Sequence, residues 1–300
     1  MNLDPRLRGD ERSTNRAWLR RCLAVLSALT LSGCATTPAG PLLRRTGLWC
    51  GGTRAQHTAA HANAASLTTL PIDPFGRLET GWAIYAPAVG HEIRARCSPS
   101  KAGFAGALSR WQQRKALPPT GVLDAGTLMP MKADWQARRP FIAVRAQGLC
   151  PAPQEAQLQA AAPGETLGGK DVRLRAGALE AYRRLVAAAR WEDPAVAADP
   201  DALKLFSGYR SPEADEARCA AENNCQGVVR ASCSSHRTGL ALDLMVGSAP
   251  GFMADSSDDA NRLFQSRTPA YRWMIRNAGR FGFVNYVFEP WHWEWTGEAP

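Results

Sequence analysis

The chain is organised around Ser234–Leu244, which reads SSHRTGLALDL, together with EPWH at residues 289–292. Each of these two segments supplies one imidazole and one carboxylate. In chain order the four side chains are His236, Asp243, Glu289 and His292. Asp243 stands between two leucines in a run that should be buried, and burying an unpaired carboxylate is costly. A metal ion or a dense hydrogen-bond network would offset this cost, so we expect the two segments to meet.

Two histidines, one aspartate and a spare glutamate are the side chains of a catalytic zinc site. Such a site has three protein ligands, an open position for water and a base beside it. Two other histidine patterns are weaker candidates. His57 and His61 share a helix face but lack the glutamate of the HExxH motif, so they are expected to be surface residues. Cys219, Cys225, Cys233 and His236 could also form a structural zinc site, but cysteines in an exported protein are expected to form disulfides.

Two glutamates compete for the role of the base. Alternate residues of a strand share a face, so Glu294 would lie on the side of His292, and Glu289 would face away on a straight strand. Pro290 fixes its own φ and removes a backbone donor, so the chain can bend there and bring Glu289 round. The residues alone leave both glutamates open.

These motifs carry a family resemblance. The pattern SxHxxGxAxD at residues 234–243, EPWH at 289–292 and the preceding SGYRS at 207–211 resemble the signatures of the zinc D-alanyl-D-alanine carboxypeptidases of the VanY type, within the wider family of the VanX dipeptidases. The likeness covers residues 172–297. It implies a Hedgehog/DD-peptidase-like catalytic domain.

The resemblance also implies roles for particular residues. The cofactor would be Zn²⁺, with three ligands: His236, Asp243 and His292. Glu289 rather than Glu294 would be the general base. Arg210 would lie near the reacting carbonyl or the charged groups of the substrate. Ser234 would either bind substrate or fix its own loop, and the sequence does not choose between these roles.

The N-terminus predicts a lipoprotein signal peptide at residues 1–33. Basic residues precede an apolar run at 22–31, which is too short for a transmembrane helix of about 20 residues. The run ends in LSGC, which resembles a bacterial lipobox and predicts a lipid anchor on Cys34. A plain secretory signal is the alternative, and the acidic residues before Arg16 leave a downstream start codon open. Ala35 favours a periplasmic protein at the outer membrane.

Composition limits the other classes of function. The 300 residues are 45% hydrophobic and carry a formal net charge of +9. A basic chain suits nucleic acid or an anionic polymer, but no dense basic tract or nucleic-acid-binding motif occurs, so no nucleic-acid partner is expected. Six cysteines follow Cys34 and are expected to form disulfides whose connectivity the sequence does not determine. They are Cys50, Cys97, Cys150, Cys219, Cys225 and Cys233.

A small helical domain is expected before the catalytic one. Phe104, Leu108 and Trp111 recur at helical spacing, and LPPTGVLD at 117–124 predicts a turn before a second helix. This order resembles a peptidoglycan-binding domain, although Ala116 stands where that family usually has glycine. The expected boundaries are a signal peptide at 1–33, a tether and N-terminal extension at 34–73, a peptidoglycan-binding-like domain at 74–145, a linker at 146–171 and the carboxypeptidase domain at 172–300.

The catalytic segment mixes helices and short strands without a regular βαβ rhythm, which predicts an α+β fold. The expected helices are at 174–189, from 212, and at 257–278 with a break at Pro269. The expected strands are at 203–207, 240–246, 283–286 and 291–295.

Together these features predict a zinc-dependent D-alanyl-D-alanine carboxypeptidase that trims peptidoglycan stem peptides in the periplasm. An L,D-carboxypeptidase or a peptidoglycan endopeptidase would use the same ligands. A non-catalytic, peptidoglycan-binding lipoprotein is the alternative from another class.

Overall fold

The computed structural model describes residues 50–225 and 232–300. The predicted signal peptide, the predicted lipidation site Cys34 and the first part of the predicted tether lie outside the described residues. The described residues fall within one compact unit of the chain, Arg44–Pro300. Among them, no helix combines the length and the apolar character that crossing a membrane requires. The domain boundaries expected from the sequence remain predictions.

The two motifs meet in a four-stranded antiparallel sheet of order β5-β6-β8-β7. Its strands are β5 (Leu205–Ser207), β6 (Ala241–Leu244), β7 (Phe283–Asn285) and β8 (His292–Trp295). The central strands β6 and β8 carry one motif each, and their register places Asp243 directly opposite His292. Directly opposed residues of antiparallel strands have neighbouring side chains. The pairing therefore brings together two groups that lie far apart in the sequence.

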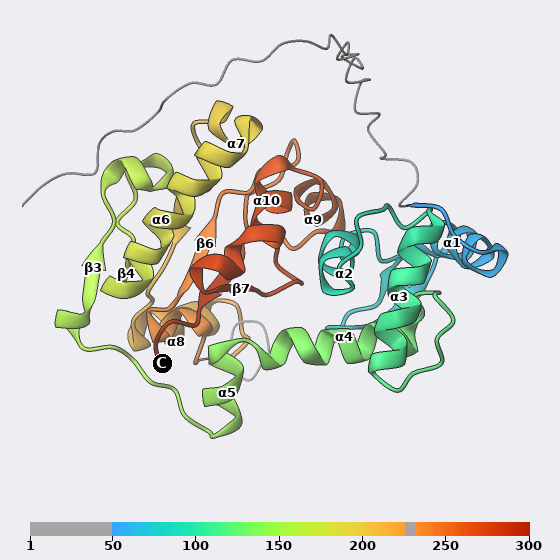
Figure 1. The fold of residues 1–300 in the computed structure, drawn as a ribbon. Helices are drawn as coiled ribbons and strands as arrows, with labels where there is room; N and C mark the ends of the chain where they lie inside the picture. The colour runs from blue at the N-terminus through green and yellow to red at the C-terminus, as the bar shows by residue number, and fades with distance from the viewer. Residues whose placement is uncertain (1–49, 226–231) are drawn as a thin grey trace, which may run out of the picture. The chain divides into compact units, whose positions relative to one another are not determined.

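Helices α6 (Ala176–Glu192) and α10 (Pro269–Asn277) pack against this sheet through a shared apolar core (Figure 1). Leu179, Tyr182 and Leu185 of α6 follow helical spacing and are buried with Leu242 and Trp293 of the central strands. The core therefore holds one face of the sheet. The mixture of helices and short strands confirms the α+β expectation.

The break expected at Pro269 is present. Helix α9 (Asp259–Gln265) ends before it, and α10 begins with Pro269 in its first turn, capped by the Thr268 hydroxyl, which accepts a hydrogen bond from the Tyr271 N–H. Proline suits the first turn because its missing N–H has no partner there. The remaining elements of this part are α7 (Pro194–Ala198), α8 (Pro212–Ala221), β3 (Leu158–Ala160), β4 (Arg173–Arg175), η2 (Glu155–Gln157), η3 (Pro163–Glu165), η4 (Leu167–Gly169), η5 (Ser235–Thr238) and η6 (Ala278–Phe281).

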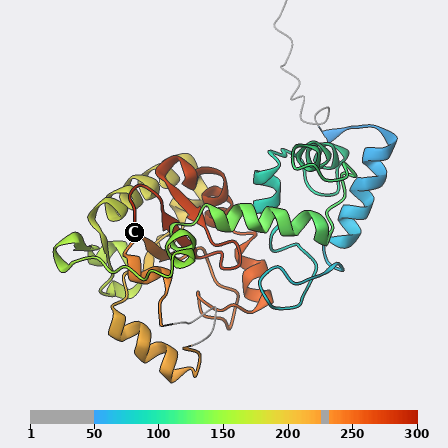
Figure 2. The same ribbon diagram turned by 90° about the horizontal axis from the view of Figure 1, so that it is seen from below.

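Residues 54–146 form a helical module. Its elements are α1 (Arg54–Ser66), α2 (Ala86–Glu92), α3 (Ala102–Arg114), α4 (Ala125–Ala137), α5 (Pro140–Ala146) and the strand pair β1 (Pro71–Ile72) and β2 (Glu79–Thr80). Helices α1 and α3 lie side by side (Figures 1 and 2). Phe104, Leu108 and Trp111 are buried on α3, as its periodicity predicts. Ala116 has a positive φ of 55°, which explains why glycine suits this position better.

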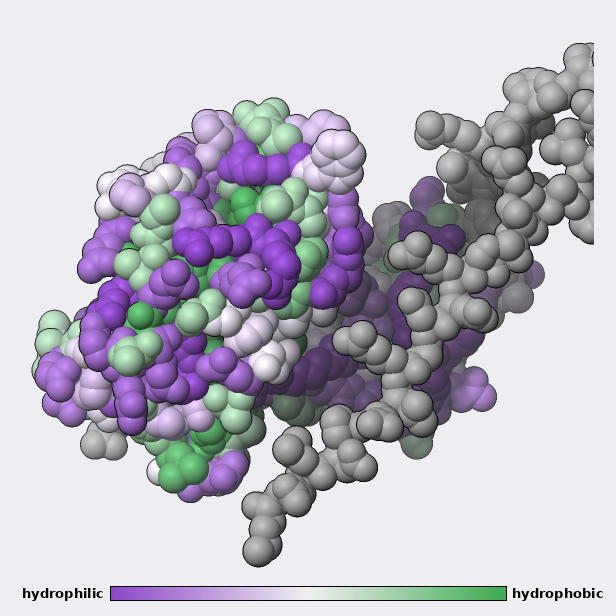
Figure 3. All heavy atoms as spheres, turned by 60° about the vertical axis from the view of Figure 1, so that its left-hand side comes forward, coloured by the Kyte–Doolittle hydropathy of each residue, from purple (hydrophilic) through white to green (hydrophobic). Residues whose placement is uncertain are grey.

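All six cysteines of the described residues are paired. The disulfides are Cys50–Cys97, Cys150–Cys233 and Cys219–Cys225. Cys233 pairs with the distant Cys150, whereas Cys219 and Cys225 are only six residues apart. A structural zinc site on Cys219, Cys225, Cys233 and His236 is excluded, since all three sulfur atoms are in disulfides. On the face drawn in Figure 3, hydrophilic side chains are interspersed with smaller apolar patches.

Candidate metal centre and active site

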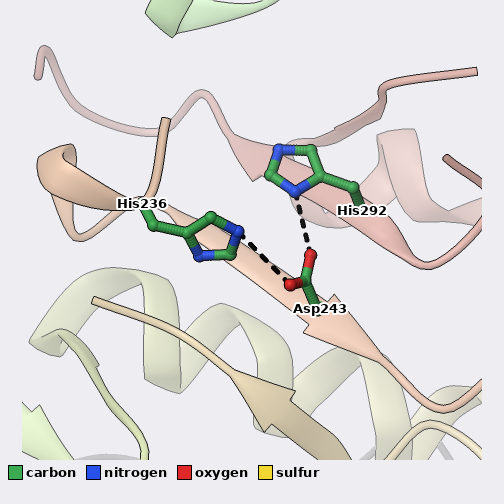
Figure 4. A group of neighbouring side chains, drawn as sticks. All are labelled: His236, Asp243 and His292. Atoms are coloured by element: carbon green, nitrogen blue, oxygen red, sulfur yellow. Dashed lines mark hydrogen bonds and ion pairs between the residues drawn. The ribbon is translucent and has the colours of Figure 1, made fainter. Parts of the chain in front are cut away.

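His236, Asp243 and His292 converge at the junction of η5, β6 and β8 (Figure 4). The Nε2 atom of His236 lies 3.3 Å from Oδ2 of Asp243, and Nδ1 of His292 lies 2.9 Å from Oδ1 of the same carboxylate. One nitrogen or oxygen from each residue lies within 4.8 Å of the other two. All three side chains are buried. The structure thus forms a candidate metal site from the three residues that the sequence singled out.

Gly239 lets the chain turn sharply from His236 into β6. Its φ is +70°, in the left-handed region that glycine adopts without strain. A Cβ atom here would also lie 3.1 Å from Arg175 and 3.2 Å from Pro153. The glycine of the motif therefore serves both the turn and the close packing behind the site.

The second ring nitrogen of each histidine has its own partner. Nδ1 of His236 lies 2.7 Å from the carbonyl oxygen of Gly208, so this nitrogen carries the proton and Nε2 faces Asp243 with its lone pair. Nε2 of His292 lies 3.1 Å from the Ser235 hydroxyl and 3.6 Å from Glu294. Metal-binding histidines are commonly oriented by such partners. The donor set of two imidazoles and one carboxylate therefore fits a divalent metal such as Zn²⁺.

The buried charges shift the pKa values of the three groups. Burial lowers the pKa of His236. Burial opposes the ionised form of Asp243, but the two histidines outweigh it and hold its pKa far below the usual range. Burial likewise opposes protonation of His292, yet Asp243 and Glu294 raise its pKa to about 9. Without a metal, the carboxylate is therefore neutralised by a proton on His292.

Glu294 is occupied by another partner. The Arg139 guanidinium lies 2.6 Å from it, and the Phe141 N–H donates to it at 3.0 Å. Burial raises the pKa of Glu294, but Arg139 and His292 outweigh this effect and lower it to about 2. Glu294 shares a side with His292, as strand alternation predicts, but it does not line the cavity in front of the site.

Glu289 lies in a turn before β8, so strand alternation does not apply to it. Its N–H donates to the carbonyl of Tyr286 at 2.7 Å, and its own carbonyl accepts from the His292 N–H at 3.0 Å. Its side chain lines the cavity beside the candidate ligands. Removal from water raises the pKa of its carboxyl group. Of the two glutamates, Glu289 therefore has the location and the basicity that proton transfer requires.

Arg262 holds the turn that carries Glu289. Its Nε donates to the carbonyl of Phe288 at 2.7 Å. The same guanidinium, which is fully buried, lies 3.1 Å from Glu79 and donates to the Tyr85 hydroxyl at 2.6 Å. Since Glu79 and Tyr85 belong to the helical module, the module supports the turn that carries Glu289.

Arg210 and Ser234 share a buried partner, Asp215 of α8. Arg210 Nη1 lies 3.2 Å from Asp215, the Ser234 hydroxyl donates to it at 2.8 Å, and Arg237 Nε also lies 3.2 Å away. Asp215 was not among the residues predicted from the motifs. The sequence offered one indication of such a residue: Arg210 and Arg237, near the motif, would need an acidic partner.

One cavity of about 320 Å³ brings together every site residue predicted within the described part. These are Arg210, Ser234, His236, Asp243, Glu289 and His292. His57 and His61 instead are exposed on α1 and do not join the metal group. The described part therefore contains one convergent site for the two motifs.

Residues 171–298 match the family model described as "VanY: D-alanyl-D-alanine carboxypeptidase". Residues 171–298 are a VanY-family domain. This confirms the resemblance drawn from the motifs. The helical module lies outside the matched segment of the VanY domain. No curated protein matches the chain. A solved structure of the LdcB LD-carboxypeptidase, described for its peptidoglycan recognition, is similar over 49% of this chain and 70% of that chain, with 22% identity and a TM-score of 0.35.

Proposed function

We propose that the chain is a zinc-dependent D-alanyl-D-alanine carboxypeptidase that removes the terminal D-alanine from peptidoglycan stem peptides. The observation that carries this proposal is the meeting of His236, Asp243 and His292 in one cavity with Glu289, inside a VanY domain. The family supports carboxypeptidase chemistry. The metal and the bond that is cleaved are the proposed parts.

The three candidate ligands would hold the metal through Nε2 of His236, a carboxylate oxygen of Asp243 and Nδ1 of His292. When bound, Zn²⁺ polarises a carbonyl group and lowers the pKa of a bound water to about 7. The Gly208 carbonyl and Glu294 would keep the two imidazoles in the required tautomers.

Glu289 would transfer the proton. Its carboxylate accepts a proton from the attacking water and then donates it to the nitrogen of the departing D-alanine. Its raised pKa makes this carboxylate a stronger base than an ordinary glutamate, which favours the first step.

Arg210 would bind a negative charge of the substrate. Its guanidinium is always charged, and Asp215 holds it at the wall of the cavity. It can bind the terminal carboxylate or stabilise the developing oxyanion. The Ser234 hydroxyl donates to Asp215, which favours a role in fixing the loop over direct contact with substrate.

The test uses purified protein and a muropeptide that ends in D-Ala-D-Ala, with and without a chelator. We expect release of D-alanine that the chelator abolishes and added Zn²⁺ restores, followed by mass spectrometry of the products. Release of D-alanine from a tetrapeptide would indicate an L,D-carboxypeptidase, and cleavage of cross-linked dimers an endopeptidase. If no peptide is cleaved under any metal condition, the carboxypeptidase proposal is wrong and the non-catalytic, peptidoglycan-binding alternative is favoured.

We also propose that Cys34 carries a lipid that anchors the protein at the periplasmic side of the outer membrane. The LSGC motif supports this, and the three disulfides suit an oxidising compartment. Metabolic labelling with an alkyne fatty acid should mark the wild type but not Cys34→Ser. Equal labelling of both would contradict the anchor.

A further inference from the structure

Helix α5 belongs to the helical module, yet the chain on each side of it is linked to a residue next to one of the two motifs. At its start, the N-cap residue Arg139 pairs with Glu294 at 2.6 Å, and the Phe141 N–H donates to the same carboxylate at 3.0 Å. Beyond its end, Cys150 forms a disulfide with Cys233. Cys233 immediately precedes the segment that carries His236. The position of α5 beside the active site is therefore fixed by covalent and ionic links.

Between these two links, α5 provides a wall of the active-site cavity. Phe141, Ile142 and Arg145 all line it. All three precede residue 171, where the VanY match begins, and so does Lys170, which also lines the cavity. This side of the pocket is therefore an addition of this chain to the matched domain.

The charges of the cavity wall differ in how they are paired. Arg139 is paired with Glu294, Arg210 with Asp215, and Arg218 lies 3.7 Å from Glu222. Arg145 and Lys170, by contrast, are exposed and have no ion-pair partner within residues 50–225 and 232–300. We call these two residues the cationic rim.

The acidic residues of the wall do not neutralise the cationic rim. Asp243 is held by the two histidines and Glu289 lies beside them. Asp255 is the remaining acid of the wall and is exposed. The unpaired rim charge thus favours anions over cations.

We propose that the cationic rim binds a second carboxylate of the substrate, so that the enzyme selects peptides with a free carboxylate upstream of the scissile bond. The inference rests on the proposed function. A cavity of about 320 Å³ is at the small end of ligand pockets, so a longer peptide whose terminus is inside must continue over the rim. There its carboxylate can pair with the positive charges of Arg145 and Lys170.

Two synthetic peptides test this. Both end in D-Ala-D-Ala and share one sequence with an acidic residue upstream, but in one peptide that carboxylate is free and in the other it is amidated. The wild type should cleave the free acid with the higher kcat/KM. One exposed ion pair is worth about 0.2–1 kcal/mol, so each of Arg145→Gln and Lys170→Gln should lower kcat/KM for the acid by about 1.5- to 5-fold, mainly through KM. The preference should also shrink at high salt.

Two control variants show whether the preference for the free-acid peptide depends on the cationic rim or on any charge of the protein surface. Arg272→Gln removes an exposed arginine of α10 that does not line the cavity, so the preference should persist. Asp255→Asn removes a charge of opposite sign from the wall and should keep or strengthen the preference. Thermal melting of each variant shows whether it is folded.

Different results of the peptide assay would contradict the rim proposal and the proposed function. The rim proposal is overturned if the wild type cleaves both peptides equally. It is also overturned if the double variant Arg145→Gln/Lys170→Gln cleaves both peptides more slowly by the same factor. In either case the carboxypeptidase assignment stands. If neither peptide is cleaved, the proposed function fails. In that case, calorimetry measures the affinity of both peptides for the wild type and for the same double variant. A loss of affinity for the free-acid peptide alone supports the rim proposal. Equal affinities of the wild type and the double variant for that peptide overturn it.

Discussion

Arg139 and Glu294 form an ion pair 2.6 Å long that is almost completely buried. The pair joins the helical module to β8, and Glu294 in turn lies 3.6 Å from Nε2 of His292. The Arg139 guanidinium also stacks on Tyr286, 4.0 Å from the ring centre, at the start of the turn that carries Glu289. A residue outside the VanY match therefore sets the charge and the packing behind both a candidate ligand and the candidate base.

The first prediction concerns this pair. Arg139→Met leaves the Glu294 carboxylate buried without its cation, which should cost about 3–5 kcal/mol of unfolding free energy. It should also weaken zinc binding by about 10- to 100-fold, because the partner of His292 is no longer held. Urea unfolding and competition with a chromophoric chelator measure the two effects. The double variant Arg139→Met/Glu294→Met should recover most of the stability, and a single variant as stable as wild type would contradict the argument.

The second prediction concerns the metal. The wild type should bind one zinc ion per chain, and His236→Ala should lose it, because two remaining ligands hold the ion poorly. Metal analysis after dialysis measures this. His57→Ala is the matched control, since His57 is an exposed histidine on α1. Equal zinc content in His236→Ala and His57→Ala would show that the ion is bound elsewhere.

The third prediction assigns the base. Glu289→Gln should lower kcat by about 10²- to 10⁴-fold, the usual contribution of a general base, while the zinc content stays near that of wild type. Glu298→Gln is the control, because Glu298 does not line the cavity. If Glu289→Gln retains full activity, proton transfer uses another group.

The part of this site that could be predicted from the sequence consists of residues that lie close together along the chain. His236 and Asp243 share one short segment, and Glu289 and His292 share another, so motif spacing reveals them. Arg139 and Glu294 are 155 residues apart, and Cys150 and Cys233 are 83 apart. Such pairs leave no periodic pattern, because the fold brings them together only after the sheet and α5 have packed. Asp215 escaped detection for the same reason: its helix is ordinary, and its partners come from other segments.

The fourth prediction concerns pH. Burial raises the pKa of Glu289 above its ordinary value of 4.5. The base acts only when ionised, so activity should fall as the pH drops through this raised pKa. The acidic limb of kcat/KM should therefore lie above pH 4.5. A pH–rate profile measures this limb, with zinc content determined at each pH to exclude metal loss. A limb at or below 4.5 would mean that Glu289 titrates as an exposed carboxyl group.

The last prediction compares two disulfides. Removing Cys150–Cys233, which closes a loop with a sequence separation of 83, should cost about 4–5 kcal/mol of unfolding free energy by the chain-entropy estimate. Removing Cys219–Cys225, with a separation of 6, should cost about 2 kcal/mol. The two Cys→Ala double variants are compared by urea unfolding and by KM. Only the first should also raise KM, because it releases the end of α5 that holds the cavity wall. If both variants raise KM alike, the wall does not depend on this link and the ion pair of Arg139 is sufficient to hold α5.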